Sequence, residues 1–473
     1  MAHFENSYLP PLPEDAYDRE RIEHSRLRKR LLTGAWKEDL EQSLSREIGP
    51  VRLRAWGEGD RTKNVFRNVV SQLSVLYDQA PIISHEKTGA SVELTKVVNE
   101  AGIWQLAGRL QQITVGIREG LYRLSVTIDK EGNAISSARI VSPDMVTAIA
   151  YPDIPDQPVC IREWRLRDTG KENGPEWTID ELDIRGVPTY RILSEDGGED
   201  LSGLFLNAPG GLVGEAYPYY CDGRPCLPYV LYHATRTGYL FDPFEGLELV
   251  EGSLTVAVLW TFWRHCVRDA SWPQRYAVGV RPAGGSVTEA NRNMAYIPTD
   301  PASLLNFEPS TDANPVLGQF AAGADPVALG EAIRAYAADL SMDFGISETD
   351  LARLGGSPRS GYAISLSREG VRSAQRRAEP QFRRGDIETL SKLAAFHNAA
   401  TGGSLPETGW TVHYPGIPLS TEEKKQSVEE WKSLAELGVA STVDLYMMIH
   451  SVSRETATRE LERIAGERRQ FTI

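Results

Sequence analysis

The sequence predicts an α+β protein in which helices come first, antiparallel strands follow, and further helices complete the chain. Three observations carry this prediction. Apolar residues recur every three or four positions over residues 1–118, they alternate with polar residues between residues 121 and 240, and the helical spacing returns at Leu247. A chain of 473 residues is too long for one ordinary core, so we expect roughly two to four domains.

Charged helices are expected at the N-terminus. Residues 19–34 and 35–49 predict two short amphipathic helices that form an exposed arm or a peripheral pair. Stronger apolar faces predict a helix over residues 64–79 and a single helix over residues 91–118.

A change of period at Leu121 marks the start of a sheet. Val, Ile, Tyr, Trp and Thr alternate with polar residues in seven stretches, which turns rich in Gly and Asp separate. The stretches are 121–129, 134–143, 145–153, 160–168, 176–184, 187–195 and 228–236. We expect them to form one antiparallel meander that the last stretch closes.

Two helices enclose an insertion rich in Pro and Gly. The first helix, residues 247–272, is apolar on nearly every side, which indicates burial in a core or between subunits. The insertion covers residues 273–324 and contains short strand-like pieces. The second helix begins with Asp325 as its cap and Pro326 at its first position. Taken alone, residues 325–403 fit an ordinary helical hairpin in a core as well as a functional part.

A loop over residues 346–361 separates the second helix from a long Arg-rich helix. We expect this loop to be mobile because glycine and proline are frequent in it. The long helix covers residues 362–400, and Pro380 should kink it. The extended segment 409–420 must pair with the earlier sheet, and residues 421–473 predict further helices.

The composition restricts the possible functions. The formal net charge is −14, and such a surface is not suited to gripping nucleic acid, which requires clustered Lys and Arg. The most apolar run, residues 254–263, is too short to span a membrane. Four cysteines are too few for a disulfide scaffold, and Cys221 and Cys226 lack a second pair at zinc spacing. We therefore expect a reducing compartment, no membrane segment and no metal site.

The sequence lacks the motifs of common enzyme and cofactor sites. None of the nucleophile-elbow, zinc-protease or dinucleotide-binding patterns occurs. Residues 356–361 match the glycine spacing of a phosphate loop, but Tyr362 stands where a lysine is needed. We expect no cofactor and no catalytic residue. A hydrolase that acts on carbohydrate with Asp and Glu is the alternative from the enzyme class.

The order of these parts resembles the portal proteins of tailed bacteriophages over almost the whole chain. MDFGISETDL (342–351) is similar to the helix end before the tunnel loop of that family. SGYAISLSREGV (360–371) is similar to the return into its long helix, and residues 420–464 resemble its C-terminal region. Another connector protein of the virion is an alternative, but such proteins are usually shorter and lack two stem helices.

The resemblance divides the chain into the regions of a portal subunit. Residues 1–246 correspond to the wing, 247–272 to the first stem helix, 273–324 to the clip, 325–345 to the second stem helix, 346–361 to the tunnel loop, 362–420 to the long helix with a returning wing strand, and 421–473 to the crown. The resemblance implies a homo-oligomeric ring, typically a dodecamer, at one vertex of the virion capsid. Double-stranded DNA would pass through it during genome packaging and ejection, with the terminase motor, a head–tail adaptor and the major capsid protein as partners.

The resemblance also implies roles for three groups of residues. The loop would touch DNA, the second stem helix would line the channel with negative charge so that DNA slides past, and apolar residues of both stem helices would join neighbouring subunits. A solvated surface position is an equal alternative for the loop arginines. The tunnel-loop residues are Arg353, Ser357 and Arg359; the channel-wall residues are Glu331, Asp339 and Asp343; the subunit-interface residues are Trp260, Trp263, Leu329 and Ile333.

The long helix carries an excess of positive charge. It contains seven Lys or Arg against four Asp or Glu. These cations could face DNA, but the acidic chain favours salt bridges to a neighbouring subunit.

Overall fold

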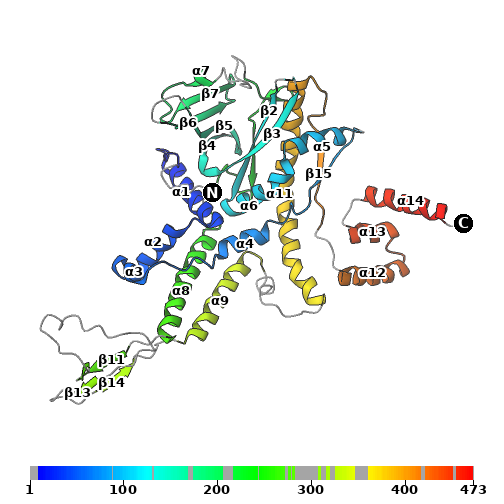
Figure 1. The fold of residues 1–473 in the computed structure, drawn as a ribbon. Coiled ribbons are helices and arrows are strands. Elements are labelled where there is room, and N and C mark those ends of the chain that lie inside the picture. The colour runs from blue at the N-terminus through cyan, green and yellow to red at the C-terminus, as the bar shows by residue number, and fades with distance from the viewer. Residues whose placement is uncertain are drawn as a thin grey trace. The chain divides into compact units, whose positions relative to one another are not determined.

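The structure is a computed structural model that describes residues 9–87, 89–129, 131, 133–168, 174–205, 217–242, 244–271, 275–278, 280–282, 307–309, 316–319, 325–346, 361–416, 421–450 and 454–471. It confirms a mixed α+β protein (Figure 1). The chain divides into two compact units, each described by itself below. The first consists of Met1–Ala35, Phe66–Leu247 and Met342–Ile473, and the second of Trp36–Val65 and Glu248–Ser341. Residues 36–65 are therefore not part of the same unit as the rest of the predicted wing.

The N-terminal helix α1 (Ala16–Thr33) is integrated into the first unit and is not an exposed arm. Asp15 caps it by accepting a hydrogen bond from the backbone N–H of Asp18 at 2.9 Å. Ile22 and Leu31 are buried, and so are two arginines. The guanidinium of Arg21 donates to the carbonyl oxygens of Pro143 and Val146, and that of Arg28 donates to the carbonyl oxygen of Glu245. Hydrogen bonds to backbone carbonyls allow these cations to be buried, which the amphipathic pattern did not indicate.

Two predicted helices before the sheet differ from the structure. Helix α4 (Val65–Leu73) ends well before residue 79. The single helix expected over residues 91–118 is two helices, α5 (Ala90–Glu100) and α6 (Ile103–Ile117). Gly102 separates them with φ of 67°, a left-handed conformation that favours glycine and ends a helix.

The strands form separate sheets, so the prediction of one meander is wrong. The 3₁₀ turn η2 (Pro143–Met145) interrupts the pairing after the third strand of the chain, and the next strands build a second sheet. The three-stranded sheet has the order β10-β2-β3 and the four-stranded sheet the order β4-β5-β6-β7. The strands are β2 (Glu119–Ile128), β3 (Ala134–Val141), β4 (Val146–Tyr151), β5 (Ile154–Arg167), β6 (Glu176–Asp183), β7 (Thr189–Ser194) and β10 (Tyr229–His233).

Three further pieces of the first unit lie beside these sheets. The returning strand β15 (Trp410–His413) pairs with β1 (Ile82–His85), a strand the sequence analysis did not predict, and not with the seven strands above. The short hairpin of β8 (Tyr220–Cys221) and β9 (Arg224–Pro225) and the helix α7 (Ser202–Phe205) complete the strand region.

The long helix α11 (Gly361–Thr401) packs on the three-stranded sheet (Figure 1). The helix continues through Pro380. Its side chains Phe382, Leu390 and Leu393 are buried in the main core of the unit. The predicted C-terminal helices are confirmed as α12 (Thr421–Glu436), α13 (Thr442–His450) and α14 (Arg454–Phe471).

The second unit contains the two predicted stem helices. They are α8 (Leu247–Ser271) and α9 (Pro326–Asp343), each within two residues of the predicted bounds. Between them β11 (Arg275–Val278) pairs with β14 (Val316–Gln319), and β12 (Val280–Pro282) pairs with β13 (Phe307–Pro309). Helices α2 (Lys37–Ile48) and α3 (Pro50–Trp56) belong to the same unit.

Candidate functional site

The residues predicted to touch DNA cannot be placed. Arg353, Ser357 and Arg359 lie outside the described residues, as does nearly all of the predicted tunnel loop. Their role stays a prediction.

The predicted channel-wall carboxylates lie on α9. Glu331, Asp339 and Asp343 are all exposed. The helix begins as predicted, because the Asp325 carboxylate accepts from the Val327 N–H at 2.8 Å. Arg334, the helix's one cationic residue, lies over the ring of Trp260 at 5.9 Å. Three exposed carboxylates and one cation give this helix a negative surface.

The predicted interface residues are largely buried or engaged inside the unit. Trp260 is 8% exposed and Ile333 is 2% exposed. Trp263 donates from Nε1 to the carbonyl oxygen of Pro326 at 2.8 Å, and its ring meets that of Trp260 edge to face. Leu329 is partly buried. Packing within one chain therefore accounts for Trp260 and Ile333, whose interface role would have to come from the little surface they retain.

Residues 56–63 of the second unit also pack on α8. The ring of Trp56 stands edge to face with Phe262 at 5.6 Å, and the Asp60 N–H donates to Oγ1 of Thr261 at 2.8 Å. The side chain of Lys63 lies over Trp260. Aromatic packing and hydrogen bonds thus join the α2–α3 segment to the first predicted stem helix, a role that sequence patterns did not reveal.

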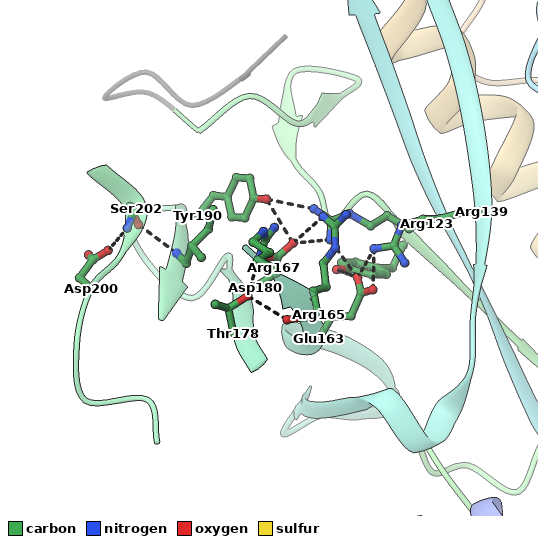
Figure 2. A network of polar contacts seen from close by, with 12 residues as sticks. Arg123, Arg139, Glu163, Arg165, Arg167, Thr178, Asp180, Tyr190, Asp200 and Ser202 are labelled. Carbon is green, nitrogen blue, oxygen red and sulfur yellow. Dashed lines mark hydrogen bonds and ion pairs between the residues drawn. The ribbon is translucent and has the colours of Figure 1, made fainter. Parts of the chain in front are cut away.

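A buried network of charges joins the two main sheets of the first unit (Figure 2). Its centre is Arg123 on β2, whose Nη1 donates to Oε2 of Glu163 at 2.9 Å and to Oδ2 of Asp180 at 2.6 Å. Glu163 lies on β5 and Asp180 on β6, and both are at most 2% exposed. Because β2 belongs to one sheet and β5 and β6 to the other, the network fixes the two sheets to each other.

More cations and two tyrosines surround these carboxylates. Arg165 and Arg167 on β5 contact Asp180, and Arg139 on β3 contacts Glu163. Tyr190 donates to Asp180, and Tyr229 donates to Glu163 at 2.7 Å. Burial alone would raise the pKa of Asp180, but the arginines outweigh it and hold that pKa well below its usual range. The network therefore keeps Asp180 ionised, which suits a structural joint and not a general acid.

Another buried carboxylate lies on α11, and no cation among the described residues forms an ion pair with it. The side chain of Asp386 is 1% exposed and accepts hydrogen bonds from the hydroxyls of Tyr77, Tyr232 and Tyr414. The Tyr232 hydroxyl is also 2.8 Å from that of Thr389. Burial raises the pKa of Asp386 to about 7, although the three tyrosine hydrogen bonds act in the opposite direction. We refer to Asp386 and these three tyrosines as the tyrosine cage.

Cations of the long helix find partners within the same chain. Arg383 pairs with Glu379, Lys392 pairs with Glu388 at 2.6 Å, and Arg384 lies 3.5 Å from Asp156. Acidic partners thus lie close to these cations along the helix or on a strand of the same chain. The expected salt bridges to a neighbouring subunit stay a prediction.

The network and the cage could not be found from the sequence alone. A signal existed in the stretch CIREWRLRD, where the charged residues Glu163, Arg165 and Arg167 alternate with the apolar residues between them. Alternation alone does not say whether such a charged face meets water or another charged face.

Two searches of the described part of the chain were negative. None of its helices has the length and apolar content to cross a membrane. It also contains no group of three or more His, Cys, Asp or Glu arranged to hold a metal ion, and Cys221 and Cys226 are free thiols.

Comparison with known proteins gave no relative. No protein-family model matches the chain, and no curated protein matches it significantly.

Proposed function

We propose that this protein is the subunit of a phage portal, a ring at one capsid vertex through which double-stranded DNA is packaged and ejected. The observation that carries the proposal is the α8–α9 pair. Two long helices enclose an insertion with short antiparallel strand pairs, and a 41-residue helix, a strand that returns to pair with β1, and three C-terminal helices follow. This is the order of parts that the sequence analysis found similar to portal proteins.

In this proposal the α8–α9 pair is the stem, and the strand pairs between the helices belong to the clip, which meets the terminase motor and later the head–tail adaptor. The first unit supplies the wing and the crown. The subunits form a closed ring, because a head-to-tail contact repeated with a fixed rotation closes on itself. The protein itself carries out no chemistry, and a separate ATPase drives packaging.

The charge of α9 supports the conduit role. Glu331 and Asp339 are exposed and the helix carries one cation, so a channel wall built from copies of α9 would repel phosphate. DNA passes such a wall without forming the phosphate contacts that would hold it in place.

Electron microscopy of the purified protein in negative stain tests the ring. We expect closed rings with a central channel, and mass measurement should give one multiple of the 52.4 kDa chain. A protein that is monomeric at every concentration and is absent from capsids would overturn the proposal.

A charge-reversal variant tests the channel wall. Glu331→Arg with Asp339→Arg should still form rings but should retain linear double-stranded DNA in a gel-retardation assay at moderate salt, where the wild-type ring does not. The matched control is Glu429→Arg with Glu436→Arg, which changes the same charge at two exposed positions of α12. Equal retention by both variants would contradict the assignment of α9 to the wall.

A further inference from the structure

The four-stranded sheet has a second face, on the side opposite the charge network. Strand residues alternate between faces, so the neighbours of the network residues along β5 and β6 point away from it. The register places Trp164 beside Ile179 and Leu166 beside Trp177. Leu193 on β7 extends the row next to Ile179. These five side chains form an apolar floor.

A groove of about 1200 Å³ lies on this floor. One wall comes from residues 11–18 at the start of α1, and the other from residues 194–201 after β7. The volume exceeds the roughly 300–1,000 Å³ of ordinary small-molecule sites, so a segment of a polymer fits it better than a metabolite does. All of the described residues that line it belong to the first unit. We refer to it as the acidic groove.

The charge of the lining is strongly one-sided. The described residues that line the groove include seven carboxylates but a single cation, Arg162. That arginine is already compensated, because its Nε donates to Glu181 at 2.7 Å within the sheet. Lys and Arg side chains are therefore the complement that the groove lacks.

Three of the carboxylates have no partner among the described residues. Asp15 and Asp18 are engaged at the start of α1, and Asp196 accepts hydrogen bonds from its own turn. By contrast, Glu14, Glu195 and Glu199 are exposed, with carboxylates to which no described group donates. They stand on both walls, so a chain lying along the floor would meet them on either side.

The floor offers apolar surface. Leu166 is 42% exposed and Trp177 is partly exposed, which is unusual for large apolar side chains gathered in one place. The indole Nε1 of Trp164, a side chain that is 7% exposed, is buried beneath the floor and has no hydrogen-bond partner among the described residues.

We propose that the acidic groove binds a basic peptide segment of another protein, in which arginine or lysine alternates with apolar side chains. The apolar side chains contact the tryptophans and leucines of the floor, and the basic side chains reach the glutamates on the walls. Nucleic acid is disfavoured because its phosphates would meet seven carboxylates. The inference goes beyond the portal proposal and does not depend on it, because it uses one unit of a single chain.

Fluorescence anisotropy with a labelled peptide tests the proposal. The probe is a ten-residue peptide of alternating arginine and leucine, added to the full-length protein. We expect saturable binding that becomes about tenfold weaker in the variant Glu14→Gln, Glu195→Gln, Glu199→Gln, since each exposed ion pair contributes a modest amount. A peptide of alternating arginine and serine should bind about tenfold more weakly than the arginine–leucine peptide, since it cannot use the floor.

A matched control separates the groove from general attraction to an acidic protein. Glu86→Gln, Glu429→Gln, Glu436→Gln removes three exposed glutamates outside the groove and changes the net charge by the same amount. Binding should stay within twofold of wild type in this control. Equal weakening by both triple variants, or equal affinity for the serine and leucine peptides, would show that charge alone attracts the probe and would overturn the proposal.

Discussion

The pKa values of two buried carboxylates of the first unit, Asp180 and Asp386, are shifted in opposite directions. Both are at most 1% exposed, and both accept several short hydrogen bonds. Asp180 lies among three arginines, which lower its pKa against the effect of burial. Asp386 lies among three tyrosines, and burial raises its pKa to about 7.

The comparison separates the role of hydrogen bonds from that of charge. Neutral hydroxyls can satisfy the oxygen atoms of a buried carboxylate, but they do not replace the solvation of a full negative charge. Opposite charges do so at close range, which is why the arginine network keeps Asp180 ionised while the tyrosine cage holds Asp386 near its titration point. The network thus holds the two sheets together permanently, whereas the charge of Asp386 in the cage changes with pH near neutrality.

The largest expected effect is the pH dependence of the cage. A carboxyl whose pKa is higher in the folded than in the unfolded protein binds its proton more tightly when folded. Its contribution to stability is therefore complete below the unfolded value of about 3.9 and is lost as the pH rises to about 7. The relevant quantity is the free energy needed to open α11, compared between wild type and Asp386→Asn. The difference between the two proteins should change by up to about 4 kcal/mol between pH 4 and pH 8.

Hydrogen exchange of the α11 amides, corrected for the intrinsic rate, measures this difference. The variant is needed because Glu119, whose pKa burial raises to about 8, titrates over a nearby range. A constant difference between the two proteins across this pH range would show that Asp386 does not titrate there.

The next effect should come from the centre of the network. Arg123→Ala leaves Glu163 and Asp180 buried with fewer cations, and we expect a loss of about 3 kcal/mol in the stability of the β5–β6 region. This is the lower end of the usual range, because Arg139, Arg165 and Arg167 remain.

The matched control is Arg162→Ala on the opposite face of β5. The side chain of Arg162 is 48% exposed, and its partner Glu181 keeps a second arginine, Arg191. We expect a loss of at most about 1 kcal/mol, because Arg162 is half exposed and the buried Glu181 still pairs with Arg191. Hydrogen exchange of the β5 and β6 amides measures the loss of stability in both variants. Equal losses would contradict the distinction between the face of β5 that carries the network and the face that carries Arg162.

A smaller effect is expected from a substitution at Gly385, where α11 lies close to Tyr232 of the cage. A Cβ atom at Gly385 would lie 2.4 Å from the ring of Tyr232, so Gly385→Ala must displace that ring and its hydrogen bond to Asp386. We expect a loss of about 2 kcal/mol from the overpacked helix–sheet contact. Gly108→Ala in α6 is the control, because nothing lies within 4 Å of its Cβ position, and alanine should stabilise that helix by up to about 1 kcal/mol. Thermal unfolding in which both variants shift in the same direction would contradict this account.

The smallest effect concerns one hydroxyl of the cage. Tyr77→Phe removes a donor that favours the ionised carboxylate, so the pKa of Asp386 should rise further above 7. At pH 8 we expect a loss of about 1 kcal/mol in the protection of α11, and a smaller loss at pH 5, where the carboxyl is protonated. A loss that is the same at both pH values would show that the hydroxyl contributes through packing and not through the charge of Asp386.

Sequence reasoning predicted the helices well where the periodicity was long and a local signal marked the end. The bounds of α8, α9 and α11 agree with the prediction because Asp325, Pro326 and the glycine pair at 402–403 act on their immediate neighbours. It failed at Gly102, where one glycine splits a helix whose apolar pattern continues on both sides. The predicted site residues divide in the same way. The exposure of Glu331 and Asp339 follows from the local helical pattern. The pattern also indicated burial around Trp260, but it left open whether one chain or a second subunit covers that side chain.

The sequence by itself determined the α+β class, most element types and the acidic character of the chain, because these follow from composition and from the spacing of neighbouring residues. Only the tertiary structure decided which strands share a sheet and which charges meet. Arg123 and Asp180 are 57 positions apart, and Tyr77 and Asp386 are 309 apart. Such partners are selected by the packing of whole sheets and helices, and no local pattern contains that information.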